Sequence, residues 1–197
     1  MHLYVLNRDL ETNDVIDEYI SLIWTTRYFT NGDFELYAPV SQKLLNVLQI
    51  GNYITRHDCN CTMMIEKIEI TTHAENGNVM IVRGKSLESL LGRRIVWGHM
   101  VLNDTAEVCI RKLVDANLIH VGESGGTTAI IPYSGILPNR LRVIPEFRLG
   151  TLKGFSDKLQ TQFTGDIVQS AVEEIAMTFG YGWRVILQND EFIFDVY

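Results

Sequence analysis

The chain has 197 residues, of which 46% are hydrophobic and 21% are charged, and these are the proportions of an ordinary globular protein. Its length suits one large domain or two small ones. No apolar run reaches the roughly 18 residues of a membrane-spanning helix, and the formal net charge of −7 argues against tight binding to nucleic acid or anionic membrane, because both need a basic surface.

The N-terminal half is predicted to be a series of short antiparallel strands. Alternating and β-branched runs predict strands over residues 2–7, 15–20, 21–30, 33–37, 52–57 and 63–72. Asn31-Gly32 and Asn76-Gly77 are dipeptides typical of tight hairpin turns. Such a run of strands favours a β-barrel, because closure removes the exposed edges of a sheet.

Two segments of this half depart from simple alternation. In strand 63–72 Glu66 interrupts the pattern, and one face is expected to carry three apolar residues, Met64, Ile68 and Ile70. Between residues 41 and 48, leucines at helical spacing follow Ser41, which predicts a short helix with a serine N-cap.

The stretch VMIVRGKSLESLLGRRIV, residues 79–96, is predicted to organise the fold. Its first four residues are apolar on both faces, which predicts a buried strand that Gly84 ends. Ser86 is the expected N-cap of a short plug helix whose apolar stripe is Leu87, Leu90 and Leu91. Gly92 is the expected C′ residue, where a left-handed conformation costs least.

The C-terminal half is predicted to be more helical. A helix is expected over residues 104–117, where Asp104 and Glu107 have the spacing of a capping box. A second helix is expected over residues 166–179, and Gly180 ends it. Each helix should be stabilised mainly by burial of its apolar stripe.

The remaining segments of this half are predicted to be a loop and short strands. Residues 121–135 are rich in Gly, Ser and Thr, which indicates a mobile loop. Residues 140–149 alternate around Pro145, as an edge strand does. The last two strands, 183–188 and 191–197, flank the turn Asn189-Asp190.

The predicted fold class is therefore α+β, mainly antiparallel β. Residues 1–98 are expected to form an antiparallel β-barrel-like domain, and residues 99–197 an α+β region with two helices and short strands. Because the final strand stops in mid-alternation with no polar tail, we expect the chain to continue into a longer parent polypeptide.

The cysteines and the N-terminus indicate where the chain folds. Cys59, Cys61 and Cys109 are sparse and odd in number, which disfavours a disulfide framework and favours a reducing, intracellular compartment. The first ten residues, MHLYVLNRDL, lack the basic and apolar regions of a signal peptide.

The sequence predicts no catalytic, cofactor-binding or metal-binding residue. His57, Asp58, Cys59 and Cys61 are metal-ligand types, but their spacing is not that of a zinc finger. The segment GESGG, residues 122–126, matches neither a phosphate-binding loop nor a nucleophile elbow, so a loop is the better interpretation.

Other single residues are of types that can serve the same roles. Glu173 and Glu174 are adjacent on a helix and point apart, which favours a solvated face over an acid–base pair. His99 and His120 complete no triad with Ser124. Arg93 and Arg94 could bind an anion. The sequence favours instead an interaction with the C-terminal end of their own helix or with an acidic neighbouring subunit.

Four segments together resemble a known family. They occur in this order: LIWTTRYFTNGDFELYAP (22–39), GNYITRHD (51–58), VRGKSLESLLGRRIV (82–96) and YGWRVILQNDEFIFDVY (181–197). RLRVIPEFRLG, residues 140–150, adds to the likeness. The set resembles the N-terminal part of siphophage or prophage tail proteins of the tail-associated, hub-like kind, and it spans essentially the whole chain.

The resemblance implies a structural, non-enzymatic role at the distal end of a phage tail tube, in the virion tail tip, after synthesis in the bacterial host cytoplasm. It implies a fold akin to baseplate hubs, which use β-barrel domains and assemble as trimers on the distal tail ring. Its implied partners are further copies of itself, the distal tail ring protein and the tape measure protein. Any catalytic domain would then lie C-terminal to residue 197.

Two other functions stay open at this point. One is a small hydrolase or carbohydrate-active domain that uses residues 121–135 as a lid. The other is a small-molecule or carbohydrate-binding module that presents Trp24, Trp97 and Tyr133 to its ligand. Convergent carboxylates and exposed aromatic residues in a concave pocket would favour either of them over the tail protein.

Overall fold

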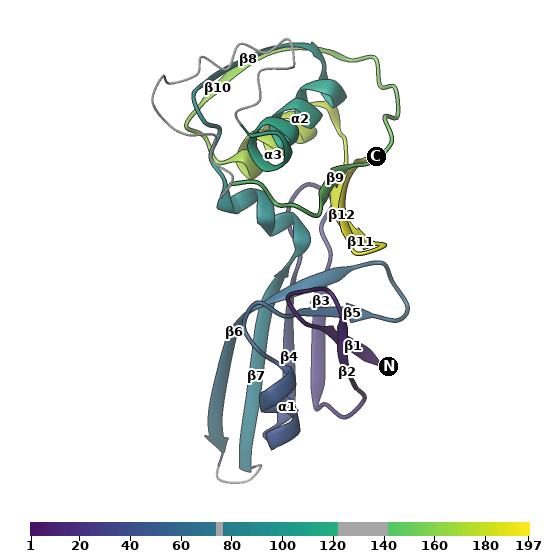
Figure 1. The fold of residues 1–197 in the computed structure, drawn as a ribbon, viewed down its shortest axis with the longest axis vertical. Coiled ribbons are helices and arrows are strands. Elements are labelled where there is room, and N and C mark those ends of the chain that lie inside the picture. Colours follow the sequence, from purple (N-terminus) through teal and green to yellow (C-terminus); the bar gives the residue numbers. More distant parts are fainter. Residues whose placement is uncertain (74–76, 122–141) are drawn as a thin grey trace. The chain divides into compact units, whose positions relative to one another are not determined.

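The computed structural model of the protein describes residues 1–73, 77–121 and 142–197. The chain divides into two compact units, which are drawn in Figure 1. Unit 1 consists of Met1–Arg27 and Asn31–Leu87, and unit 2 consists of Tyr28–Thr30 and Glu88–Tyr197. The expected division into domains at residue 98 stays a prediction.

Unit 1 is a seven-stranded antiparallel sheet with the strand order β2-β1-β5-β6-β7-β4-β3. Its strands are β1 (Leu3–Leu6), β2 (Thr12–Ile16), β3 (Ser21–Thr25), β4 (Asp33–Pro39), β5 (Tyr53–Arg56), β6 (Thr62–His73) and β7 (Gly77–Ser86). One short helix, α1 (Gln42–Val47), begins at Ser41, whose hydroxyl accepts the Leu44 N–H at 3.2 Å as the sequence predicts.

The core of unit 1 joins strands that are far apart in the sheet order. Val5 of β1, Leu36 of β4 and Val82 of β7 belong to one buried apolar cluster, to which α1 adds Leu44 and Val47. Strands three and more places apart meet in one core only if the sheet curls over it. The order leaves β2 and β3 as edges, however, so no closed barrel is detected in the described residues.

The interruption predicted at Glu66 is a β-bulge. The register between β6 and β7 shifts between Ile65 and Lys67, and the extra residue reverses the alternation of the strand. For this reason the inward-facing residues before the bulge are Met63 and Ile65, which share the core with Ile68. The prediction that Met64 lies on that face is therefore wrong.

The central stretch differs from the prediction at both glycines and at Ser86. Strand β7 continues through Gly84 instead of ending there. A glycine is required at this position because β7 passes so close to β6 that a Cβ would fall on the Met64 carbonyl. Ser86 is the last residue of this strand, and its hydroxyl accepts the Gly32 N–H at 2.7 Å instead of capping a helix. The plug is a 3-10 helix, η1 (Leu87–Arg93), that runs through Gly92.

The hairpin of β3 and β4 is present, but its turn is longer than Asn31-Gly32 predicts. The strands pair from Ser21↔Tyr37 to Thr25↔Asp33. The predicted strand 21–30 thus ends at Thr25, and Tyr28–Thr30 belongs to unit 2, where the Trp183 indole donates to the Phe29 carbonyl at 2.7 Å. The β6–β7 hairpin is confirmed up to the pair His73↔Gly77, and Asn76 lies outside the described residues.

Unit 2 combines two small sheets with helices. Its strands are β8 (His99–Thr105), β9 (Phe147–Leu149), β10 (Lys158–Thr164), β11 (Trp183–Gln188) and β12 (Glu191–Val196), in a β10-β8 pair and a β11-β12-β9 sheet. Its helices after η1 are α2 (Ala106–Val114), the π-helix η2 (Asp115–Ile119) and α3 (Val168–Phe179). Helices α2 and α3 lie side by side and bury apolar residues such as Ile110, Leu113, Val172 and Ile175 (Figure 1).

In unit 2 the predicted helix end and tight turn are present, but the predicted capping box is not. Gly180 ends α3 in a left-handed conformation, with φ +73, and Asn189 and Asp190 both have positive φ in the tight turn between β11 and β12, as predicted. The capping box is wrong, because the α2 N-cap is Thr105 and Glu107 bonds elsewhere. Of the predicted edge strand 140–149, the structure shows only β9, which is indeed an edge and pairs in parallel with β12.

Candidate interaction surfaces

The residue types suggestive of a metal do not converge. Arg56 binds both carboxylate oxygens of Asp58, at 2.9 Å and 2.6 Å, and this hydrogen bonding lowers the pKa of Asp58. Cys59 and Cys61 are half-buried thiols that form no disulfide. Within 1–73, 77–121 and 142–197 no group of three or more His, Cys, Asp or Glu could hold a metal ion. The metal-free assignment stays a prediction.

Three of the other candidate residues, His99, His120 and Glu173, have a local partner. His99 Nδ1 lies 2.8 Å from the Thr164 hydroxyl, and His120 Nδ1 lies 2.8 Å from Asp115. Glu173 accepts a hydrogen bond from Gln169 at 2.8 Å, and Glu174 is exposed. Ser124, the segment 122–126 and nearly all of the predicted loop 121–135 lie outside the described residues.

The aromatic residues proposed for ligand binding have different environments. Trp24 is half-buried, packs against the core of unit 1 and stacks on Phe34 with ring centroids 5.7 Å apart. Trp97 in unit 2 is 45% exposed. Tyr133 lies outside the described residues. Of the two described residues, Trp24 therefore packs against the core of unit 1, and Trp97 is the more exposed.

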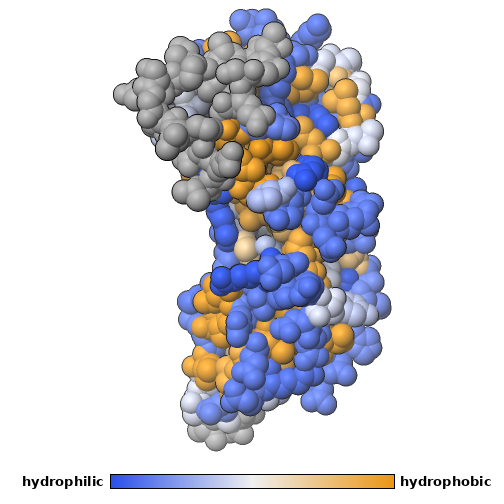
Figure 2. Space-filling model, viewed as in Figure 1, coloured by the Kyte–Doolittle hydropathy of each residue, from blue (hydrophilic) through white to orange (hydrophobic). Residues whose placement is uncertain are grey.

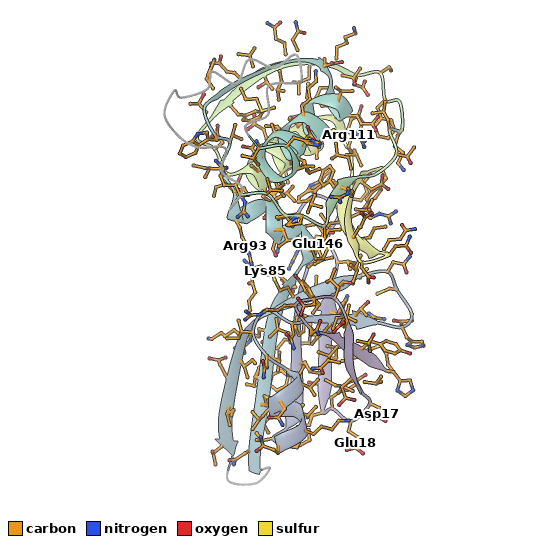
Figure 3. All side chains as sticks on the ribbon, viewed as in Figure 1. Asp17, Glu18, Lys85, Arg93, Arg111 and Glu146 are labelled. Atoms are coloured by element: carbon orange, nitrogen blue, oxygen red, sulfur yellow. The ribbon has the colours of Figure 1, made fainter. Side chains whose placement is uncertain are left out.

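Helix α2 anchors the segment that follows β9, a role that the sequence did not reveal. The buried Glu107 carboxylate accepts the N–H groups of Lys153, Gly154 and Phe155 at 2.6, 2.8 and 3.0 Å. One turn later, Arg111 (Figure 3) donates to the Gly150 carbonyl at 2.6 Å. These bonds fix a loop, so Glu107 is a structural residue and not an acid positioned for catalysis.

The solvent-facing side of the unit 1 sheet carries a charge network. Arg83 of β7 forms ion pairs with Glu35 of β4 and Glu69 of β6, which flank it on the neighbouring strands. Lys67 pairs with Glu69 at 2.7 Å. Because these charges satisfy one another, the face offers no unpaired charge at this position.

Unit 2 has a different kind of surface, which we call the arginine patch: Arg94, Ile95, Trp97, Arg142 and Ile167. Arg94 donates to the Arg142 carbonyl at 2.9 Å, and Arg142 donates to the Ile95 carbonyl at 2.6 Å. The Arg142 guanidinium lies 5.1 Å from the Trp97 ring centroid, within cation–π range. The three apolar side chains are exposed, at 42% for Ile95, 45% for Trp97 and 47% for Ile167.

The two guanidinium groups of the arginine patch have no counter-charge among the described residues. Neither forms an ion pair with any carboxylate in the described part of the chain. Burial lowers the pKa of Arg94 and of Arg142, and a neighbouring arginine lowers each further. The patch is therefore partly desolvated and positively charged within a chain of net charge −7.

Unit 1 carries exposed residues of the opposite sign after β2. We call Asp17, Glu18, Ile20 and Ile23, which are exposed and lie within seven positions of the sequence, the acidic patch. Asp17 and Glu18 are exposed in the turn that leaves β2, where Figure 3 labels them, and neither has an ion pair with a described residue. Ile20 is 61% exposed, and Ile23 on the edge strand β3 is 56% exposed. Figure 2 shows hydrophobic residues at the surface among hydrophilic ones.

A family comparison covers nearly the whole chain. Residues 2–197 match the family described as Siphovirus ReqiPepy6 Gp37-like protein. The chain belongs to this siphovirus tail protein family. The resemblance to phage tail proteins predicted from the sequence is thereby confirmed. No curated protein matches the chain.

Solved structures share the fold at low sequence identity. A prophage tail protein, gp18 from Listeria monocytogenes EGD-e, has a TM-score of 0.57 and 9% identity, and the match covers 98% of this chain and 50% of that one. The tail protein from Neisseria meningitidis MC58 has a TM-score of 0.56 and 12% identity, with the same coverage of 98% and 50%. The siphovirus tail protein described here thus spans half the length of either structure.

The fold of the chain agrees with the family assignment. The fold is mainly antiparallel β with a few helices and resembles those tail proteins. In the described ranges, no helix is long and apolar enough to cross a membrane. The chain belongs to a siphovirus tail protein family, and it carries two patches of opposite charge.

Proposed function

We propose that this chain is a structural component of a phage or prophage tail tip, a hub or tail-associated protein that joins the distal tail ring to host-contacting parts. The observation that supports this most is the fold, which two solved tail proteins share over 98% of the chain. Membership of a siphovirus tail protein family over residues 2–197 supports it independently.

In this proposal the protein assembles with copies of itself as a trimer, and it binds the distal tail ring protein and the tape measure protein. A closed ring of identical copies needs heterologous, head-to-tail contacts. Unit 1 has open edges at β2 and β3, and such edges favour pairing or coverage by another chain. Closure of the predicted barrel would require these two edges to meet or to be covered in the assembly.

In this proposal the segment has no enzymatic role, and any catalytic domain lies C-terminal to it in a longer protein. Its formal charge of −7 suits a tube component past which DNA moves without sticking, since a polyanion is repelled by an acidic surface. The protein would be made in the bacterial host cytoplasm and would end in the virion tail tip.

Co-assembly tests the proposal. The chain, and the longer polypeptide that contains it where one is encoded, is run on size exclusion with light scattering, alone and mixed with the distal tail ring protein of the same phage. The expected result is a stable complex of the two proteins. A chain that never associates with that ring protein would overturn the tail-tip assignment and favour a ligand-binding module.

A further inference from the structure

We propose that the acidic patch of one copy binds the arginine patch of a second copy, so that neighbouring subunits join head to tail. The inference rests on the proposed function, in which copies of this chain assemble, and it names the surfaces and residues that do so. The contact would pair Arg94 and Arg142 with Asp17 and Glu18, and the exposed apolar residues of both patches would pack around these charges.

The arginine patch has the composition of a protein-binding surface. Tryptophan and arginine dominate the energetically important residues of protein interfaces, and here Arg142 lies over Trp97 at 5.1 Å. The backbone carbonyls of Arg142 and Ile95 hold the two guanidinium groups in place, through the bonds at 2.9 and 2.6 Å. Positioned guanidinium groups with free donors bind carboxylates in a bidentate manner.

The counter-charge for this patch is missing from the described residues. Two partly buried, neighbouring guanidinium groups repel each other, and a carboxylate brought next to them would offset both the repulsion and the desolvation. Two positive charges with flanking apolar residues are best matched by two negative charges with flanking apolar residues.

The acidic patch meets that requirement. Asp17 and Glu18 are consecutive, exposed and without a described ion-pair partner, and Ile20 and Ile23 add exposed apolar surface a few residues away. The chain has two other pairs of consecutive carboxylates, and one member of each already has a partner: Glu173 bonds Gln169, and Glu191 pairs with Arg148. The acidic patch is therefore the better complement.

A second copy is the occupant that the overall charge favours. Copies of a chain with net charge −7 repel one another unless a basic surface meets an acidic one. The acidic patch lies on unit 1 and the arginine patch on unit 2. When the acidic patch of one copy binds the arginine patch of a second copy, the first copy keeps its arginine patch and the second keeps its acidic patch for the next subunit.

Charge reversal tests the contact. We expect Arg94→Glu with Arg142→Glu, and separately Asp17→Lys with Glu18→Lys, each to weaken self-association at least about tenfold, as like charges then face each other. Sedimentation velocity over a range of protein concentrations measures it. The variant with all four changes should recover association to within about threefold of wild type, since the pairing is restored with its signs exchanged.

A matched control carries the same change of net charge elsewhere. Lys85→Glu with Lys158→Glu replaces two exposed lysines outside both patches and should leave self-association within about threefold of wild type. If wild type assembles and the patch variants assemble equally well, the inference is overturned while the proposed function stands. If the wild-type protein stays monomeric at every concentration, the inference fails, and so does the self-assembly that is part of the proposed function.

Cross-linking distinguishes contact between copies from contact within one chain. In a background of Cys59→Ser with Cys61→Ser, Glu18→Cys and Ile95→Cys are made in separate chains and mixed under mild oxidation. We expect a disulfide-linked dimer in the mixture and little in either variant alone. Absence of a dimer in the mixture would overturn the inference. Glu123 is the one acidic residue in the sequence of residues 122–141, and loss of self-association in Glu123→Gln would also overturn the inference.

Discussion

The carboxylate of Glu107 accepts the backbone N–H of Gly154 at 2.8 Å, forty-seven residues along the chain. The same carboxylate accepts two neighbouring N–H groups, so one buried side chain satisfies three backbone donors of the segment after β9. Hydrogen bonds to a charged acceptor are stronger than bonds between neutral groups, and three of them make Glu107 a structural anchor of unit 2.

Glu107→Ala is therefore expected to lower the free energy of unfolding by about 2 kcal/mol or more, because it removes three hydrogen bonds to a buried carboxylate. Glu107→Gln keeps one oxygen and should cost less than the alanine variant. Urea denaturation at neutral pH measures both. Glu174→Ala, at an exposed carboxylate of α3, is the control and should stay within about 0.5 kcal/mol of wild type. Equal stability of Glu107→Ala and wild type would show that the anchor is dispensable.

Gly84→Ala is expected to destabilise unit 1 by about 3 kcal/mol or more, beyond the usual range of overpacking. The added methyl group would fall on the Met64 carbonyl and lie 2.6 Å from the Phe34 ring, and a strand backbone cannot move aside without loss of the β6–β7 register. Gly92→Ala is the matched control, since its nearest obstacle is the movable Gln169 side chain at 2.7 Å. Urea midpoints that fall equally for the two variants would contradict this reasoning.

Leu91→Ala and Leu90→Ala are each expected to cost about 2–5 kcal/mol, the range for truncation of a buried leucine. Leu91 is fully buried and Leu90 is 7% exposed, both on η1. Met177→Ala, at a side chain that is 60% exposed on α3, should change stability little. Losses below about 0.5 kcal/mol in a chemical denaturation series would mean that the 79–96 stretch does not organise the fold.

Acidification should weaken unit 1 through Glu35. A hydrogen bond from the Tyr37 hydroxyl and the Arg83 guanidinium lower the pKa of Glu35 below its ordinary value of 4.5. A lowered folded-state pKa contributes stability that is present above pH 4.5 and is lost as the pH falls through the lower folded value. The urea midpoint should decline below that pH, and Glu35→Gln should flatten the decline. Asp9→Asn, the same type of change at an exposed carboxylate, is the control for the substitution itself.

Replacement of Cys59 and Cys61 by serine should change neither metal content nor stability by more than about 0.5 kcal/mol. Asp58 is already bound by Arg56, and among the described residues no three His, Cys, Asp or Glu side chains are grouped so that they could hold a metal ion. Elemental analysis of the purified protein checks the metal content. Stoichiometric zinc in the wild type that disappears from the double variant would show that these thiols are ligands.

Local signals allowed the sequence alone to determine many element ends and the buried leucines. Ser41 caps α1, Gly180 ends α3 and Asn189-Asp190 turns β11 into β12, because each acts on backbone groups within a few residues. The leucines at helical spacing after Ser86 are buried as predicted. The family resemblance also came from the sequence, through several short segments in a fixed order.

Only the tertiary structure decided the roles of residues whose partners are remote. Ser86 bonds Gly32, Gly84 lies against Met64 and Glu107 holds Gly154, and no local pattern distinguishes such residues from caps or strand ends. The two patches likewise depend on exposure and on missing counter-charges, which a sequence does not display. The physical reason is common to all of them: hydrogen bonds, close packing and desolvation act between atoms that folding brings together, whatever their separation along the chain.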